Sequence, residues 1–356
     1  MTTAGPEGSP QRLRLAVVLM NLGGPDTQQA VRPFLRNLFS DPAIITLPGF
    51  LRLPLATLIS TFRAKSARAN YARMGGGSPI LKETQAQADA LKAALDLALP
   101  DLEVRVFIAM RYWKPFTEDT AREVAAWDAD EVLLLPLYPQ FSTTTTGSSM
   151  GAWKRSYAGA ARVRTVCCYP VATDLIEAHA QAIRASFAAA GSPANTRLLF
   201  SAHGLPEKII EAGDPYQSQI EATAQAVAER LGPGWDWRVC YQSRVGPMKW
   251  LGPSTVEAIL EASEEGFGVI ITPIAFVSEH IETLVELDHE YALLAQEHGC
   301  PSYIRVPALG IAPGFISTLR DAVVQRLGQA EAVCPQGPAC RHGFSACPHT
   351  STRSAA

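Results

Sequence analysis

The chain has 356 residues, 47% of them hydrophobic, and a formal net charge of −3 at pH 7. This length suffices for two domains with full cores, and the near-neutral charge gives no reason to expect a nucleic-acid partner. No apolar run is long enough for a membrane-spanning helix. The short apolar run after Arg12 and Arg14 lacks a signal-peptide cleavage site, so we expect a cytoplasmic protein with reduced thiols.

Eight apolar segments have the length and composition of buried strands, and helical patterns separate them. The expected strands are 13–20, 103–110, 131–137, 163–169, 196–201, 237–241, 269–276 and 303–306. The expected helices are 27–38, 82–97, 118–126, 173–189, 218–231, 254–264, 279–297 and 314–327. Such repeated alternation predicts an α/β fold of parallel sheets covered by helices on both faces. Two groups of four strands indicate two similar Rossmann-like domains.

The expected domains follow this grouping. An N-terminal α/β domain occupies 13–175 after a flexible tail at 1–12, and a C-terminal α/β domain occupies 176–312. The last helix, 313–328, is expected to pack back on the N-terminal domain. A cysteine-bearing extension at 329–356 follows it.

Histidine, aromatic and basic residues follow the strands directly. Arg111 and Tyr112 come after the second strand, His203 after the fifth, and Trp250 and His280 after the next two. Open α/β sheets bind their ligands at the carboxyl ends of their strands. Because turn-forming glycines and prolines do not explain these side chains, the pattern predicts a binding site at this edge of the sheets.

Four glutamates form a predicted stripe on the helix that begins near Ser278. Glu279, Glu282, Glu286 and Glu290 are spaced 3, 4 and 4 residues apart, which places them on one helical face. Like charges at this spacing destabilise a helix, so we expect a role in carrying protons or a divalent cation. Glu282 is expected to be the most critical member, Glu286 the next, and Glu290 dispensable.

The segment 44–59 is apolar but is interrupted by Pro48, Arg52 and Pro54. Proline disfavours the interior of a core helix, so we expect an exposed apolar lip beside the ligand site. Such a lip also predicts peripheral contact with the inner face of the cell membrane. A packed loop is the alternative.

Six motifs together resemble the ferrochelatases, which insert ferrous iron into a porphyrin in the last step of protoheme synthesis. They are NLGGP at 21–25, GGGSPI at 75–80, FSTTTTGSS at 141–149, SAHGLP at 201–206, QSRVGPMKWLGP at 242–253 and PIAFVSEHIETLVELD at 273–288. The resemblance extends from about Leu15 to about Leu327. It implies a chelatase-like fold whose two domains face each other across a cleft, with protoporphyrin IX and Fe²⁺ as substrates.

The resemblance implies catalytic roles for four residues. His203 would remove the pyrrole protons, because a base of near-neutral pKa is needed there. Glu282 would face His203 beside the incoming Fe²⁺, and Glu286 would conduct protons or metal further along. His280 would support this pair.

The porphyrin would bind between apolar walls and polar groups that hold its propionates. The residues that match this family site are Leu22, Arg63, Tyr71, Ser78, Arg111, Tyr112, Tyr138, Trp250 and Phe276. Among them, Arg63 and Ser78 match the propionate side. Arg111 and Tyr138 match inner positions opposite His203.

The extension resembles the C-terminal segment of ferrochelatases that bind a [2Fe–2S] cluster. Cys334, Cys340 and Cys347 are three of the four thiolates that such a cluster needs. In the animal enzymes the upstream ligand stands where this chain has Thr143, so Cys167 or Cys168 is the expected fourth ligand. A Cys₃His zinc site that uses His342 or His349 remains the alternative.

The sequence is also compatible with other functions. A coproporphyrin III ferrochelatase would share the motifs, and a cobalt or sirohydrochlorin chelatase would share the fold but is shorter and lacks the apolar lip. An inactive haem or iron–sulfur sensor could dispense with His203 or Glu282, and both residues are present.

Overall fold

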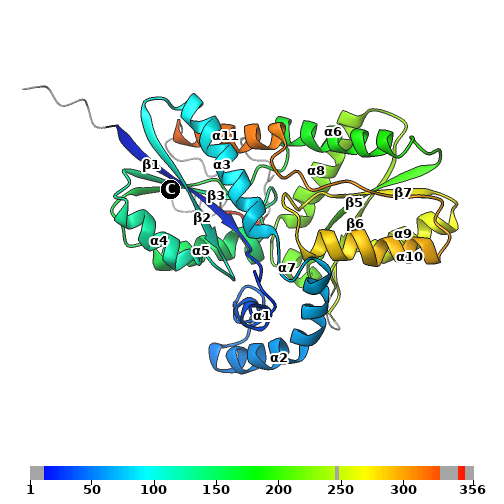
Figure 1. The fold of residues 1–356 in the computed structure, drawn as a ribbon, viewed down its shortest axis with the longest axis horizontal. Coiled ribbons are helices and arrows are strands. Elements are labelled where there is room, and N and C mark those ends of the chain that lie inside the picture. Colours follow the sequence, from blue (N-terminus) through cyan, green and yellow to red (C-terminus); the bar gives the residue numbers. More distant parts are fainter. Residues whose placement is uncertain (1–11, 245–247, 329–343, 349–356) are drawn as a thin grey trace, which may run out of the picture.

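The computed structural model describes residues 12–244, 248–328 and 344–348. Two four-stranded parallel sheets form its centre (Figure 1). The first contains β1 (Leu13–Asn21), β2 (Leu102–Met110), β3 (Glu131–Pro136) and β4 (Arg162–Thr165). The second contains β5 (Thr196–His203), β6 (Asp236–Gln242), β7 (Gly268–Pro273) and β8 (Tyr303–Arg305). The predicted α/β fold is confirmed.

Helices connect the strands and cover both faces of each sheet (Figure 1). They are α1 (Val31–Phe39), α2 (Gly49–Arg73), α3 (Ile80–Ala98), α4 (Thr117–Ala126), α5 (Ser148–Ser156), α6 (Thr173–Ala189), α7 (Glu207–Glu211), α8 (Tyr216–Leu231), α9 (Thr255–Glu264), α10 (Tyr291–Glu297) and α11 (Pro313–Leu327). Two π-helical segments, η1 (Thr143–Gly147) and η2 (Glu282–Glu290), precede α5 and α10.

The two sheets have the same topology. Their strand orders are β2-β1-β3-β4 and β6-β5-β7-β8, and every neighbouring pair is parallel. The carboxyl ends of the strands within each sheet therefore lie at one edge. This arrangement brings the loops after β1, β2 and β3 together, and likewise the loops after β5, β6 and β7.

Helices α6 and α11 join the two halves of the molecule (Figure 1). Leu175 of α6 and Phe315 of α11 are buried in one core with β1 and β3, whereas Ile183 of α6 is buried with β5 and α8. Near the end of α11, Arg326 donates from Nε to the carbonyl oxygen of Thr165 at 3.0 Å. The last helix thus contacts the N-terminal sheet.

The apolar segment 44–59 differs from expectation, because most of it belongs to the 25-residue helix α2. Pro48 precedes the helix and Pro54 lies exposed in its second turn, where proline removes a single backbone donor. Small side chains of α2, at Ala56, Ser60 and Ala64, are buried, and α2 packs against α1. Tertiary packing of this small-residue face compensates for the proline.

The helix expected at 279–297 begins later than expected, and its first part is π-helical rather than α-helical. Glu279 and His280 lie outside the helix, and Glu282–Glu290 is π-helical before α10 continues. The stripe geometry predicted for Glu279 is therefore wrong, because that residue lies outside the helix. π-Helical turns are rare and frequently occur at functional sites.

The remaining differences concern short elements. The strand expected at 163–169 ends at Thr165, and the helix expected at 27–38 starts at Val31. No helical periodicity marks η1, α5 or α7 in the sequence, because these elements are short and rich in Ser, Thr and Gly or follow proline.

Candidate active site

His203 and Glu282 form a close pair between the carboxyl end of β5 and the first residue of η2. The Nδ1 atom of His203 lies 2.8 Å from Oε2 of Glu282. The side chain of His203 is 38% exposed and that of Glu282 is 17% exposed. Since Nδ1 contacts the carboxylate, Nε2 remains to face a ligand.

The electrostatics of this pair increase the proton affinity of the imidazole. Burial favours the neutral imidazole, but attraction to Glu282 outweighs it, with the Glu282 hydrogen bond and Glu286 adding to the effect, and the pKa of His203 is raised above its ordinary value. Burial disfavours the Glu282 carboxylate, yet attraction to His203, supported by His280 and Ser243, holds the pKa of Glu282 below its usual range. His203 is therefore a base with a strong affinity for a proton.

Glu286 lies one turn further along η2, and its pKa is raised rather than lowered. Its Oε2 accepts hydrogen bonds from Oγ of Ser243 at 2.7 Å and from Nε2 of Gln242 at 3.0 Å. Burial and repulsion by Glu282 raise the pKa of Glu286 to about 7. A carboxyl group with this pKa can accept and release a proton near neutral pH.

Gln242 and Ser243 are functional candidates that the sequence analysis did not identify. Gln242 also donates to the carbonyl oxygen of Glu282 at 2.8 Å and accepts at Oε1 from Ser201 at 2.7 Å. It is 1% exposed and connects the ends of β5 and β6 to η2. These two residues begin the family motif at 242–253 with the tripeptide QSR, and this motif is the sequence feature that could have identified them.

The strand-end loop that presents His203 requires a glycine. A Cβ atom on Gly204 would lie 2.9 Å from the carbonyl oxygen of Gln242 and 3.4 Å from the Trp250 ring. The backbone of Gly204 donates to that same carbonyl at 2.8 Å. Close approach of two strand ends therefore excludes a side chain here and places Trp250 beside the His203 loop.

His280 and Glu279 lie behind the site. His280 is 7% exposed, and its ring lies 4.7 Å from that of Phe276. Burial lowers the pKa of His280, which favours a neutral ring. The Glu279 carboxylate binds Arg305 of β8 and does not point along the row of glutamates formed by Glu282 and Glu286.

The predicted inner-pocket residue Arg111 is held by a buried carboxylate. Arg111 Nη2 lies 2.8 Å from Asp41 Oδ2, and Arg111 Nε donates to Oγ of Ser148 at 2.7 Å. Asp41 is 4% exposed and also accepts from Ser148 Oγ and, at 2.7 Å, from the hydroxyl of Tyr112. Asp41 was not predicted as a site residue, because a single Asp–Pro pair after a helix has no distinguishing sequence pattern.

The other predicted porphyrin residues occupy different depths. Tyr112 is 0% exposed and Tyr71 4% exposed, and both pack with Leu22 and Ile281 in one apolar cluster. That cluster joins the loop after β1 to the residue before Glu282. Leu22, Ser78, Tyr138, Trp250 and Phe276 are partly exposed, and Arg63 is exposed on α2 with its guanidinium 5.8 Å from the Phe39 ring.

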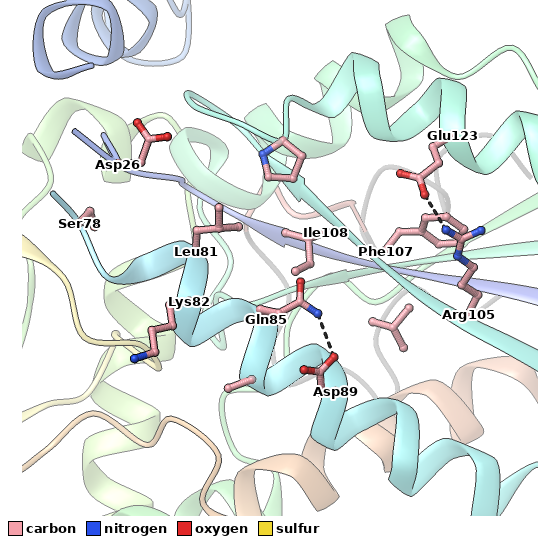
Figure 2. Close-up of a pocket in the computed structure, with 13 residues that line it drawn as sticks. Asp26, Ser78, Leu81, Lys82, Gln85, Asp89, Arg105, Phe107, Ile108 and Glu123 are labelled. Carbon is pink, nitrogen blue, oxygen red and sulfur yellow. Dashed lines mark hydrogen bonds and ion pairs between the residues drawn. The ribbon is translucent and has the colours of Figure 1, made fainter. Parts of the chain in front are cut away.

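Two open surface depressions lie elsewhere. One is lined by Arg73, His289, Glu290 and Leu293. The larger follows the free edge of β2 between α3 and α4 and reaches Ser78 (Figure 2). Among its charged side chains, Arg105 pairs with Glu123 at 2.7 Å. Neither depression contains His203 or Glu282.

Of the cysteines expected as cluster ligands, some lie outside the described residues and some lie within them. Cys334, Cys340 and the alternative ligands His342 and His349 lie outside the described residues. Cys167 and Cys168 are both 1% exposed, with their sulfurs 3.4 Å apart, and Cys347 is 2% exposed. Within residues 12–244, 248–328 and 344–348, no three His, Cys, Asp or Glu side chains are grouped as metal ligands. None of the helices described there is long and apolar enough to cross a membrane.

Comparison with known proteins decides the family. The Ferrochelatase family model matches residues 14–327. The chain belongs to the ferrochelatase family. A curated ferrochelatase from Caulobacter vibrioides (strain NA1000 / CB15N) is 64% identical over 337 residues, which cover 94% of this chain and 97% of that protein. One from Phenylobacterium zucineum (strain HLK1) is 59% identical over 343 residues, 96% and 100% of the two chains.

The predicted function is confirmed at the level of this family, as an enzyme of haem synthesis that inserts metal into a porphyrin. Among solved structures, SirB from Bacillus subtilis with Fe3+ aligns with a TM-score of 0.51 and 13% identity over 88% of this chain and 95% of that chain. This likeness confirms the two-domain chelatase fold and nothing about the substrate. The ferrochelatase relatives, not this distant chelatase, bear on the chemistry.

Proposed function

We propose that this ferrochelatase-family enzyme inserts Fe²⁺ into protoporphyrin IX, with His203 as the base. The observation that carries the proposal is the 2.8 Å contact between His203 Nδ1 and Glu282 Oε2. It orients the imidazole so that Nε2 is the atom available to a pyrrole N–H. The carboxylate then stabilises the imidazolium that forms, as in other carboxylate–histidine pairs.

Two protons must leave as one Fe²⁺ enters, so that the total charge of reactants and products balances. His203 accepts a proton from a pyrrole nitrogen, and the Glu286 carboxylate, whose pKa is about 7, can accept a proton further along η2. Arg111 lies on the inner side of the proposed pocket, where Asp41 neutralises its charge. That neutralisation reduces repulsion of an approaching cation.

Metal-insertion kinetics test the proposal. Purified enzyme is mixed anaerobically with Fe²⁺ and either protoporphyrin IX or coproporphyrin III, and the Soret band is followed. We expect faster insertion into protoporphyrin, because the exposed apolar side chains of α2 favour the less polar substrate. A preference for coproporphyrin would reassign the substrate, and haem binding without insertion would favour the sensor alternative.

We also propose that α2 and the turn before it contact a membrane surface at the cytoplasmic face. Large apolar side chains are exposed on this segment, namely Ile44, Leu47, Phe50, Leu51, Leu53, Leu58 and Phe62. An exposed apolar helix face flanked by basic residues suits the headgroup region of a bilayer. In this position the segment would form one lip of the porphyrin entrance.

Replacing Phe50, Leu51 and Leu53 by Ser is expected to weaken binding to anionic liposomes about tenfold or more, because each buried apolar group contributes on the order of 1 kcal/mol. The KM for protoporphyrin should rise, while kcat stays unchanged. Liposome flotation and steady-state kinetics measure these quantities. The control replaces Leu97, which is also exposed, at the end of α3, and equal loss in both variants would contradict a specific contact.

For the cysteine extension we propose a [2Fe–2S] cluster held by Cys334, Cys340 and Cys347 with Cys167 or Cys168. The described residues fit this group in two respects. Cys167 and Cys168 form a buried thiol pair, and Gln219 donates to the Cys168 sulfur at 3.6 Å. Segment 344–348 carries the buried Cys347 and docks on the loop before α8, where Ala346 donates to the Gly213 carbonyl at 3.3 Å.

The cluster proposal predicts a reddish protein that contains two irons and absorbs in the visible range as [2Fe–2S] centres do. Cys347→Ser is expected to remove this absorption, whereas Cys300→Ser, outside the proposed ligand set, should leave it unchanged. Absorption spectra and iron and sulfide analysis check this. A colourless protein with stoichiometric zinc would favour the Cys₃His site instead.

A further inference from the structure

Glu279 was expected in the acidic stripe, yet its contacts lead to β8. Its Oε1 accepts from Arg305 Nη1 at 2.6 Å and from the backbone N–H of Ala308 at 2.9 Å. Its Oε2 is buried and has no hydrogen-bond partner within the described part of the chain. Arg305 is therefore the main counter-charge of a carboxylate three residues before Glu282.

The same guanidinium binds the other end of the π-helical turn. Arg305 Nε and Nη2 donate to the two carboxylate oxygens of Asp288 at 2.6 and 2.8 Å. Asp288 lies two residues after Glu286. Such a two-point arginine–carboxylate contact fixes orientation as well as distance. Arg305, with 14% of its side chain exposed, thus connects residues on both sides of Glu282 and Glu286.

Tyr303 of the same strand adds a third contact to η2. Its hydroxyl donates to the carbonyl oxygen of Leu287 at 2.7 Å. Residues 303 and 305 are two positions apart on β8, so their side chains leave the same face of the strand. The short β8 strand therefore binds η2 from one side through Leu287 and Asp288, and binds the turn before it through Glu279.

A π-helix is less stable than an α-helix and usually persists only for about one turn, whereas η2 spans nine residues. Contacts from outside must compensate for this difference. We infer that Arg305 is a positioning residue that keeps η2 in register, so that Glu282 meets His203 and Glu286 meets Ser243. This inference rests on the proposed function, because positioning matters only if these residues act on the substrate.

The test compares Arg305→Met with a matched control, Arg197→Met. Arg197, in β5 of the same domain, is also buried and binds both oxygens of Asp236, at 3.0 and 2.9 Å, and Glu265 at 2.8 Å. Both variants should unfold at lower temperature. Only Arg305→Met is expected to lower kcat per folded molecule, by about tenfold or more because small misplacements of catalytic groups are costly, with KM within about twofold.

A second readout needs no turnover. Histidine-selective NMR titration follows His203, whose signal is identified by its loss in His203→Ala. If η2 shifts in Arg305→Met, Glu282 moves from His203 and the pKa of His203 falls; Arg197→Met should leave it unchanged. An unshifted His203 titration in Arg305→Met overturns the inference, whether or not the wild type inserts iron. Absence of insertion by the wild type would instead refute the proposed function.

If Arg305→Met does not fold, Arg305→Lys serves as the test variant. Lysine keeps the charge but cannot bind Asp288 at two points and Glu279 together. It is expected to give a partial loss of kcat and a smaller fall in the pKa of His203. Wild-type values for both would equally overturn the inference.

Discussion

His203→Ala is expected to abolish iron insertion, with kcat falling on the order of 10²–10⁴-fold. The imidazole is the base whose Nε2 remains available while Nδ1 contacts Glu282. Porphyrin binding should persist, because the apolar and propionate-binding groups are unchanged. Anaerobic insertion kinetics and porphyrin fluorescence quenching measure the two effects separately.

His298→Ala is the control for this experiment, since His298 is exposed at the end of α10. It should keep wild-type kcat and KM. Wild-type turnover in His203→Ala would refute the assignment of the base. Loss of both turnover and porphyrin binding would show that His203 chiefly shapes the pocket.

Glu282→Gln and Glu286→Gln are expected to lower kcat, the first by about 10²-fold or more, but to change stability in opposite directions. The Glu282 carboxylate is stabilised by His203, so its loss lowers the melting temperature. For Glu286, by contrast, burial and repulsion by Glu282 raise the pKa to about 7.

The pH dependence separates the two variants. A carboxyl group whose pKa is raised on folding stabilises the protein below its unfolded pKa, near 4.5, and this contribution is lost as pH rises towards about 7. Glu286→Gln should therefore match the wild type below about pH 4. At pH 8 its unfolding free energy should exceed that of the wild type by up to roughly 3 kcal/mol, because the pKa rises from 4.5 to about 7 and each pKa unit corresponds to about 1.4 kcal/mol. Glu282→Gln should be least stable relative to wild type near pH 6, where His203 is charged.

Thermal unfolding between pH 4 and 9 measures both curves. Two parallel curves, displaced in the same direction from the wild type at every pH, would contradict the assignment of opposite roles to the two carboxylates. Glu290→Gln is the matched control, because Glu290 is exposed and lies 4.0 Å from Arg73.

The strand-end residues illustrate what the sequence predicts well. Periodicity places β5 and β7, and parallel pairing then requires His203 and the residues after Pro273 to share one edge of a sheet. The contact between His203 and Glu282 follows from that topology. The motifs were sufficient to identify the family, because several long matches occur together along one chain.

Other features depend on packing that no local pattern encodes. Helix α2 forms despite Pro54, because its small residues pack against α1. The π-helical segment that begins at Glu282 contacts β8, which lies more than ten residues further along the chain. Asp41 and Gln242 became candidates only when Arg111 and Glu286 were found beside them.

A crystal structure of the enzyme with bound porphyrin tests the central claim most directly. We predict that His203 Nε2 lies within hydrogen-bond reach of a pyrrole nitrogen, roughly 3 Å, on one face of the macrocycle. Arg111 should lie on the opposite face, and the propionates should point towards Ser78 and Arg63. A porphyrin bound with His203 and Arg111 on the same face, or bound in the groove along β2, would contradict this account.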